Sequence, residues 1–243
     1  MDKSKRDIHQ IVAPIFAGEM LDEDFQPIAL LGTAFSIGNG YFLTAGHVLD
    51  SAKQYKSIVL GFRRDFPDHL QFCPVRSSEY KVAPDVGLIS ANLIEVKPLL
   101  WNAEQLLSLT DVRSHGFPFG YDTKTKLTFN RSVKGYVVSA LRSWEKYELS
   151  FHCPRGISGA PLISNDDHYQ VTGLITGNAS VDIEVYKETE LLDDGQVRTT
   201  YFKTETTTFG IALQASEVLK QNFEMLNGTI ENHLKSQNLL IGQ

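Results

Sequence analysis

A serine set between glycines is the first candidate for chemistry. Ser158 lies in residues 156–161, which read Gly-Ile-Ser-Gly-Ala-Pro. A serine hydroxyl becomes a nucleophile only when a base removes its proton, and glycines let a substrate approach the backbone closely. In such a turn we expect the N–H groups of Gly156 and Ser158 to form an oxyanion hole. Taken alone, the same residues also fit a tight turn before a strand.

The candidate base is His47, in residues 41–49, which read Tyr-Phe-Leu-Thr-Ala-Gly-His-Val-Leu. The apolar run followed by small residues predicts a strand and a turn, with the imidazole at the strand end. An imidazole exchanges its proton near neutral pH, as a general base must. The sequence has seven histidines, so a structural histidine is the alternative.

The candidate carboxylate is Asp85, in residues 83–89, which read Ala-Pro-Asp-Val-Gly-Leu-Ile. A carboxylate directly before an apolar strand needs a partner if it is buried. The N–H of an imidazole is such a partner, and the carboxylate would then fix the tautomer of the ring. The alternative is an aspartate that forms a turn after proline.

Short strands punctuated by glycine and proline dominate the chain. We expect a first set at residues 29–37, 41–43, 57–62 and 86–90, and a second at 111–116, 127–138, 148–153, 160–163, 170–176 and 207–213. Strands do not alternate with long helical patterns, which argues against a doubly wound α/β sheet. A helix is expected to begin at the N-cap Ser216, to include Leu226 and to stop at Asn227-Gly228.

The three motifs, in this order, resemble the trypsin-like peptidase superfamily, in the style of compact bacterial members such as HtrA-type peptidases and glutamyl endopeptidases. The separations from histidine to aspartate and from aspartate to serine are 38 and 73 residues. The resemblance implies an all-β fold of two packed antiparallel β-barrels with a C-terminal helix. It places the first barrel at residues 1–95, a linker at 96–110 and the second barrel at 111–243. It implies a serine endopeptidase with the triad His47, Asp85 and Ser158 and an acyl-enzyme intermediate.

The resemblance also implies where a substrate would bind. His152, six residues before the serine, stands at the position of the pocket floor, where it either contacts a polar side chain or packs silently. Thr176, Gly177 and Asn178 continue the strand that flanks the substrate. Thr176 is expected to hydrogen-bond near Asp85, and Gly177 to leave the pocket wall open. The histidine that glutamyl endopeptidases use is replaced by Ile175, so their specificity does not carry over.

Residues 183–206 read as an insertion in the second barrel. The stretch is polar and charged, and Asp194-Gly195 lies between residues that suit strands. A projecting β-hairpin and a surface loop remain equal alternatives. A long insertion beside a cleft is more often functional than idle, so we expect it to contact a protein substrate or a regulatory protein.

Charge and composition narrow the partners. The net charge of −6 and the scattered basic residues argue against nucleic acid and membrane surfaces as partners. The first residues are charged and no apolar signal-peptide core follows, no PDZ-like segment is seen, and Cys73 and Cys153 suit reduced thiols better than a disulfide. We therefore expect a cytoplasmic protein. No cofactor or metal is expected, because His115, His152, Cys153 and His168 have no ligand spacing.

Two other functions fit parts of the sequence. A trypsin-fold module that binds or regulates without catalysis is the main alternative, and a serine-reactive probe separates it from an enzyme. An α/β-hydrolase esterase has the order Ser, Asp, His, which would require residues such as Asp194 and His233. Its Gly-x-Ser-x-Gly motif is not met, since Ala160 takes the last position.

Overall fold

A computed structural model describes residues 12–21, 24–63, 70–92, 98–119, 121–122, 128–141, 145–164, 169–191, 193, 195 and 197–241. His168 and Asp194 lie outside these residues. No helix in the described part of the chain is long and apolar enough to cross a membrane.

The first half of the chain forms a closed barrel. Its strands follow the order β1-β2-β3-β6-β5-β4, and every neighbouring pair is antiparallel. Asn39 and Gly40, both with positive φ, connect β2 to β3 as a two-residue hairpin turn. A short helix, α1 (Gly46–Ala52), follows β3. The strands are β1 (Val12–Leu21), β2 (Asp24–Gly38), β3 (Tyr41–Thr44), β4 (Ser57–Arg63), β5 (Leu70–Lys81) and β6 (Val86–Ala91).

The second half forms a similar ring. The order is β11-β8-β9-β10-β13-β12, and β12 returns to pair with β11, so these six antiparallel strands also close. Two short strands, β7 (Trp101–Asn102) and β16 (Leu240–Ile241), extend the sheet beyond β12. The ring strands are β8 (Asp111–Gly116), β9 (Arg131–Leu141), β10 (Lys146–Leu149), β11 (Pro161–Ser164), β12 (Val171–Leu191) and β13 (Val197–Gln214).

The predicted all-β fold is therefore confirmed. Two closed antiparallel rings leave no place for the parallel sheet of an α/β-hydrolase. One apolar cluster joins the halves: Phe35 and Leu43 of the first ring pack with Leu174 and Leu213 of the second. The indole of Trp101, from the segment that connects the rings, stacks on Phe35 at 5.9 Å. This shared core fixes the two rings against each other.

The C-terminal segment is helical only in part. The helix expected from Ser216 to Leu226 is wrong in extent: α2 (Ala215–Leu219) begins after Gln214 and ends at Leu219. A small hairpin of β14 (Asn222–Phe223) and β15 (Gly228–Thr229) follows, with a 3₁₀ turn, Glu224–Leu226, between its strands. The chain reverses direction at Asn227, whose φ is 50°. Phe223, at the start of this hairpin, is buried in the core. A second helix, α3 (Ile230–Ser236), completes the segment.

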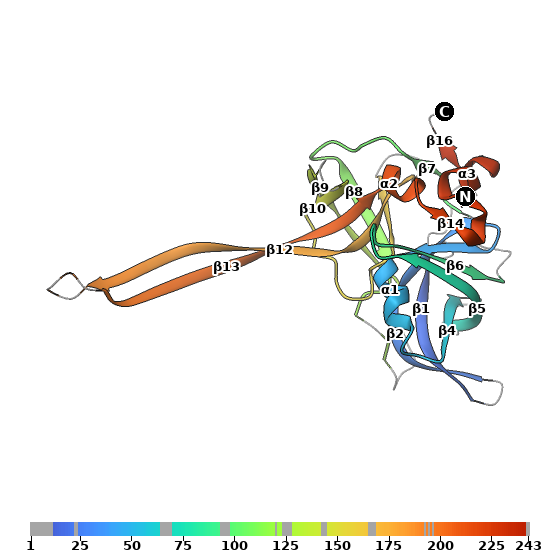
Figure 1. Cartoon of the computed structure of the whole chain (residues 1–243), viewed down its shortest axis with the longest axis horizontal. Helices are drawn as coiled ribbons and strands as arrows, with labels where there is room; N and C mark the ends of the chain where they lie inside the picture. Colours follow the sequence, from blue (N-terminus) through green and yellow to red (C-terminus); the bar gives the residue numbers. More distant parts are fainter. Residues whose placement is uncertain are drawn as a thin grey trace, which may run out of the picture.

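The insertion is a hairpin made of the barrel strands themselves. β12 and β13 pair from Gly173 and Gln214 in the barrel to Leu191 and Val197 at the far end. Figure 1 shows this hairpin leaving the body of the molecule on the side opposite α3.

Candidate active site

His47 and Asp85 come together at the start of α1. His47 lies in the first turn of this helix, and Asp85 directly precedes β6. The backbone N–H of His47 donates to Asp85 Oδ1 at 2.7 Å, and the ring atom Nδ1 lies 2.7 Å from Asp85 Oδ2. One carboxylate thus binds an N–H that has no acceptor within the helix and also orients the imidazole. The side chain of His47 is 47% exposed and that of Asp85 23%.

Gly46 is the residue that lets the carboxylate come this close. A Cβ at this position would lie 2.4 Å from the carbonyl oxygen of Lys81 and 3.0 Å from Asp85 Oδ1. Any side chain would therefore displace the segment that carries Asp85. The glycine of the Thr-Ala-Gly-His motif has a steric reason, which is the approach of residues 81–85.

The turn that carries Ser158 is docked on the first ring. The carbonyl oxygen of Ser158 accepts a hydrogen bond from the N–H of Thr33 at 2.9 Å. Gly159, with φ of 87°, is so close that a Cβ would lie 2.2 Å from both the Thr33 carbonyl oxygen and Thr44 Oγ1. Thr44 ends β3, three residues before His47. The serine turn therefore packs against the strand end from which His47 follows.

Two N–H groups of this turn have no acceptor among the described residues. The carbonyl of Arg155 accepts from Phe119 N at 2.9 Å, and that of Ile157 accepts from Ala160 N at 2.9 Å. In a trans peptide the N–H points away from the preceding carbonyl, so these bonds fix the N–H directions of Gly156 and Ser158. Within the described part of the chain, no hydrogen bond uses either N–H.

Thr33 is a residue that the sequence analysis left without a role. Its hydroxyl donates to the carbonyl of Gly156 at 2.8 Å and accepts from the N–H of Phe117 at 3.1 Å. Thr33 is fully buried in β2, and a buried hydroxyl needs such partners. It ties the serine turn to the first ring. A threonine among apolar residues in a predicted strand was the only local signal.

The residues expected at the substrate pocket lie on two segments: His152 precedes the serine turn, and Thr176, Gly177 and Asn178 belong to β12. His152 is exposed, so it is not packed in a strand. Asn178 binds Cys153 through both ends of its amide: Oδ1 accepts from Cys153 N and Nδ2 donates to Cys153 O, each at 2.8 Å. The hydroxyl of Thr176 lies 3.4 Å from the carbonyl oxygen of Ile211, turned toward β13. Gly177 has open space where a Cβ would stand.

The side chain of Cys153 is buried beside the two hydrogen bonds that join its backbone to the Asn178 amide. It is a free, buried thiol, as is Cys73. Burial raises the pKa of the Cys153 thiol to about 12, so the group is neutral at physiological pH. A Cβ on Gly210 of β13 would lie 2.7 Å from the Cys153 sulfur. The segment before the serine therefore packs tightly on β13.

The other histidines named above lie in different surroundings. His115 Nδ1 is hydrogen-bonded to Ser132 Oγ at 2.6 Å. His233 lies in α3, with Nε2 3.2 Å from the carbonyl oxygen of Ile37. This contact holds α3 on the first ring.

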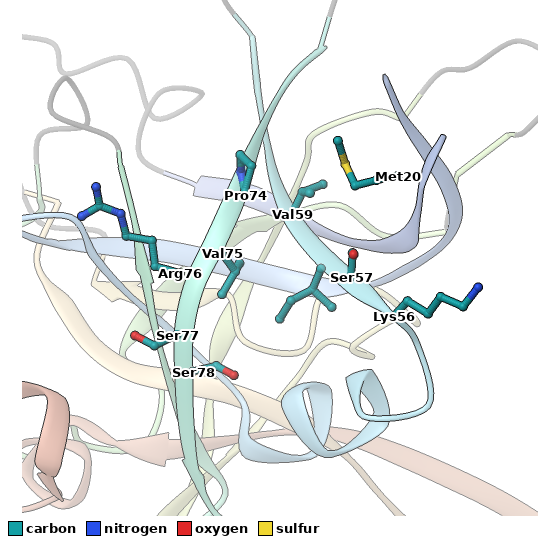
Figure 2. Close-up of a pocket in the computed structure, with 10 residues that line it drawn as sticks. Met20, Lys56, Ser57, Val59, Pro74, Val75, Arg76, Ser77 and Ser78 are labelled. Carbon is teal, nitrogen blue, oxygen red and sulfur yellow. The ribbon is translucent and has the colours of Figure 1, made fainter. Parts of the chain in front are cut away.

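A surface groove of about 400 Å³ lies elsewhere, beside β4 and β5 (Figure 2). Lys56 and Arg76 stand at its sides, and Lys56 pairs with Glu19 at 3.0 Å. None of its lining residues belongs to the segments that carry His47, Asp85 or Ser158.

Comparison with known proteins places the fold described above in a known family. Residues 32–174 match the family model of the trypsin-like peptidase domain. No curated protein sequence matches the chain significantly.

Solved structures give the same fold. The chain is similar to Rv3671c from M. tuberculosis H37Rv in an inactive form, at 18% identity and a TM-score of 0.54, covering 86% of this chain and 83% of that one. It is also similar to the serine endoprotease from Yersinia pestis, at 14% identity and a TM-score of 0.55, covering 94% of this chain and 64% of that one. Identities this low establish the chymotrypsin-like fold alone.

Proposed function

Because this chain belongs to the trypsin-like peptidase family, we propose that it is a serine endopeptidase in which Ser158 is the nucleophile, His47 the base and Asp85 the carboxylate that orients the base. The observation that carries the proposal is the pair of 2.7 Å contacts between His47 and Asp85. These two residues are 38 positions apart in the sequence, and they meet in the way that lets a carboxylate orient an imidazole.

The hydrogen bond to Asp85 sets the tautomer of His47. When Asp85 Oδ2 accepts the proton on Nδ1, the other ring nitrogen, Nε2, is left without a proton and is able to take one. In the proposed reaction Nε2 accepts the Ser158 hydroxyl proton as Oγ attacks the peptide carbonyl carbon. The imidazolium then gives that proton to the leaving amine, an acyl-enzyme remains on Ser158, and water releases it by the same steps.

The free N–H groups of Gly156 and Ser158 are suited to the oxyanion that forms in each step. The carbonyls of Arg155 and Ile157, which precede them, are already hydrogen-bonded, and this holds the two peptide planes and limits backbone rearrangement when charge develops. Thr33 supports this arrangement because its hydroxyl holds the Gly156 carbonyl. These donors and Ser158 lie on one turn, which brings the nucleophile and the oxyanion site together.

The substrate residue before the scissile bond is proposed to lie between residues 152–155 and β12. Asn178 spans this space with its two hydrogen bonds to Cys153. Room for a large side chain is therefore reduced, which favours substrates with a small residue at this position. His152 and Gly177 stand at the open side and are proposed to contact the peptide.

The experiment that tests the function is cleavage of a denatured proteome by the purified protein, with sequencing of the new N-termini. We expect new termini with wild type and none with Ser158→Ala, and small residues before the cleaved bond. Loss of the nucleophile in such triads costs on the order of 10⁶ in turnover. If wild type and Ser158→Ala release the same termini, the proposal is wrong.

A further inference from the structure

The outer part of the β12–β13 hairpin, residues 180–208, forms an arm without support from the rest of the molecule. Within the described residues, the arm strands pair only with each other, since the ladders to β11 and β10 end at Leu174 and Gly210. Figure 1 shows the arm extending away from both rings. A two-stranded ribbon is only marginally stable in water, so one with well-ordered pairing and no covering element is a candidate binding surface.

One face of the arm, called the apolar face below, carries a row of exposed apolar side chains. Residues directly opposite each other share a face, and the pairs Val181–Thr207 and Ile183–Glu205 define it. Tyr186 and Tyr201 continue this face after a register shift that leaves Val185 unpaired. All five apolar side chains are exposed, by 48% to 58%: Val181, Ile183, Val185, Tyr186 and Tyr201.

The other face is polar near the body, where two hydrogen bonds join its side chains. Ser180 Oγ lies 3.1 Å from Thr208 Oγ1, and Thr206 Oγ1 donates to Asp182 Oδ1 at 2.7 Å. Alternation of apolar and polar residues is the pattern of a sheet with one face buried. In the arm that face is exposed, which points to a partner that covers it.

The charge of the arm limits what this partner is. Residues 180–208 contain seven acidic and three basic residues, so they hold −4 of the net −6 of the whole chain. On the apolar face itself, Glu205 lies opposite Ile183, Lys203 opposite Tyr186 and Glu188 opposite Tyr201, and Lys203 pairs with Glu205 at 3.3 Å. Two copies of the arm placed face to face would repel each other, whereas a partner with basic side chains is attracted.

The arm is also continuous with the candidate active site. Asn178, two residues before the arm on β12, holds Cys153, which lies five residues before Ser158. A polypeptide bound on the arm is thereby tethered to the body that carries Ser158, and its effective concentration there rises.

We propose that the apolar face of the arm is an exosite for protein substrates, and that it binds substrate segments rich in apolar and basic side chains. This inference rests on the proposed peptidase function. It adds a second contact, away from the scissile bond, that selects which proteins are cleaved.

Binding is tested with the full chain carrying Ser158→Ala. The probe is a short fluorescein-labelled peptide of alternating valine and lysine, and its control has glutamate in place of lysine. Fluorescence anisotropy should show binding of the lysine peptide at least about tenfold tighter than the glutamate peptide, weakening with salt. The double variant Ile183→Thr/Tyr201→Thr keeps β propensity and should lose at least about tenfold in affinity.

A matched pair on the polar face, Thr204→Ser/Thr208→Ser, should bind the lysine peptide as the parent does. Circular dichroism and thermal unfolding should be the same for both double variants. Equal binding of the two peptides, or binding unaffected by Ile183→Thr/Tyr201→Thr, overturns the proposal. So does a concentration-dependent dimer in sedimentation that this double variant abolishes, because the face would then serve a second copy of the chain.

Cleavage separates this proposal from the peptidase function. With Ser158 intact, the apolar-face variant should cleave a short peptide as wild type does, but cleave more slowly a fusion of that peptide to the valine–lysine segment. Equal rates on the fusion contradict the exosite alone. If neither substrate is cleaved by wild type, the peptidase proposal fails, while the binding data on Ser158→Ala still judge the arm.

Discussion

At the scale of single residues, the Asp85 carboxylate has two donors, and they have different consequences. The backbone N–H of His47 holds the carboxylate in place, and the ring Nδ1 makes the contact on which the proposed mechanism depends. A change that keeps the first contact but alters the second therefore isolates the role of the ring. Asparagine at this position has the shape of aspartate and can still accept the backbone N–H through its Oδ1.

Asp85→Asn should lower turnover by about 10⁴-fold at neutral pH, because the amide donates to Nδ1 and stabilises the tautomer with its proton on Nε2. The measurement is kcat on a short peptide, with circular dichroism as the check on folding. A loss smaller than tenfold in a folded variant would mean that another carboxylate orients the base.

Thr33 offers a second test at this scale, since its hydroxyl joins the serine turn to Phe117. Thr33→Val leaves the Gly156 carbonyl and the Phe117 N–H without their partner in a buried site. We expect a loss of about 1–3 kcal/mol in the free energy of unfolding. We also expect a fall in kcat of up to about 10²-fold, because Gly156 is no longer held in position. Thr33→Ser should restore both values; equal behaviour of valine and serine would show that the hydroxyl has no part in positioning.

At the scale of elements, α3 is held on the first ring by a titratable contact. His233 binds the carbonyl of Ile37 and packs edge-on against Tyr41, with ring centroids 5.3 Å apart. Burial lowers the pKa of His233 below its ordinary value, against hydrogen bonds to the backbone of Ile37 and Gly38 that raise it. The unfolded chain therefore takes up this proton at higher pH than the folded protein does.

This contact predicts a loss of stability on acidification. The contribution of His233 is present above about pH 6.5 and is lost as the pH falls through the lower pKa of the folded state. His233→Gln can still donate to Ile37 but does not titrate, so its free energy of unfolding should fall less below pH 6.5 than that of wild type. Urea unfolding of both proteins at a series of pH values measures this. Parallel curves would contradict it.

Elements with regular patterns were predictable from the sequence, and two irregular strands were not. β1 (Val12–Leu21) contains Pro14 and Gly18, which normally interrupt strands. In the structure its register shifts beside Gly18, and β4 pairs only with residues from Ile15 to Gly18, so Pro14 is on a part of β1 that β4 does not reach. β5 (Leu70–Lys81) has Pro74 and a polar run, and it shifts register between Val75 and Ser77.

The candidate site divides in the same way. The motifs around His47, Asp85 and Ser158 are local and visible in the sequence, and their catalytic roles stay a proposal. Thr33 is 123 residues from Gly156, and no local pattern announces a contact over that distance. The two hydrogen bonds between Asn178 and Cys153 likewise depend on how residues 151–158 lie against β12.

At the scale of the whole molecule, the body and the arm are separable. Among described side chains, the buried residues of β12 end at Ile175, and those of β13 begin at Gly210. The apolar cluster that joins the rings thus receives no described side chain from residues 183–206.

Replacing residues 183–206 with a short Gly-Ser turn should therefore leave the body intact. We expect an unchanged midpoint of thermal unfolding and unchanged hydrolysis of a short peptide, with slower cleavage of proteins that the arm would bind. Calorimetry and peptide kinetics on the shortened chain measure this. A lower midpoint would show that the arm stabilises the rings.

The central claim is that Ser158 is an activated nucleophile, and covalent labelling tests it most directly. A fluorophosphonate reacts with serines that a base has activated and whose oxyanion is stabilised. Purified wild-type protein should be labelled at a single residue, identified by mass spectrometry as Ser158, and Asp85→Asn should be labelled far more slowly. Folded wild-type protein that stays unlabelled at Ser158, or is labelled equally fast in Asp85→Asn, would contradict the account.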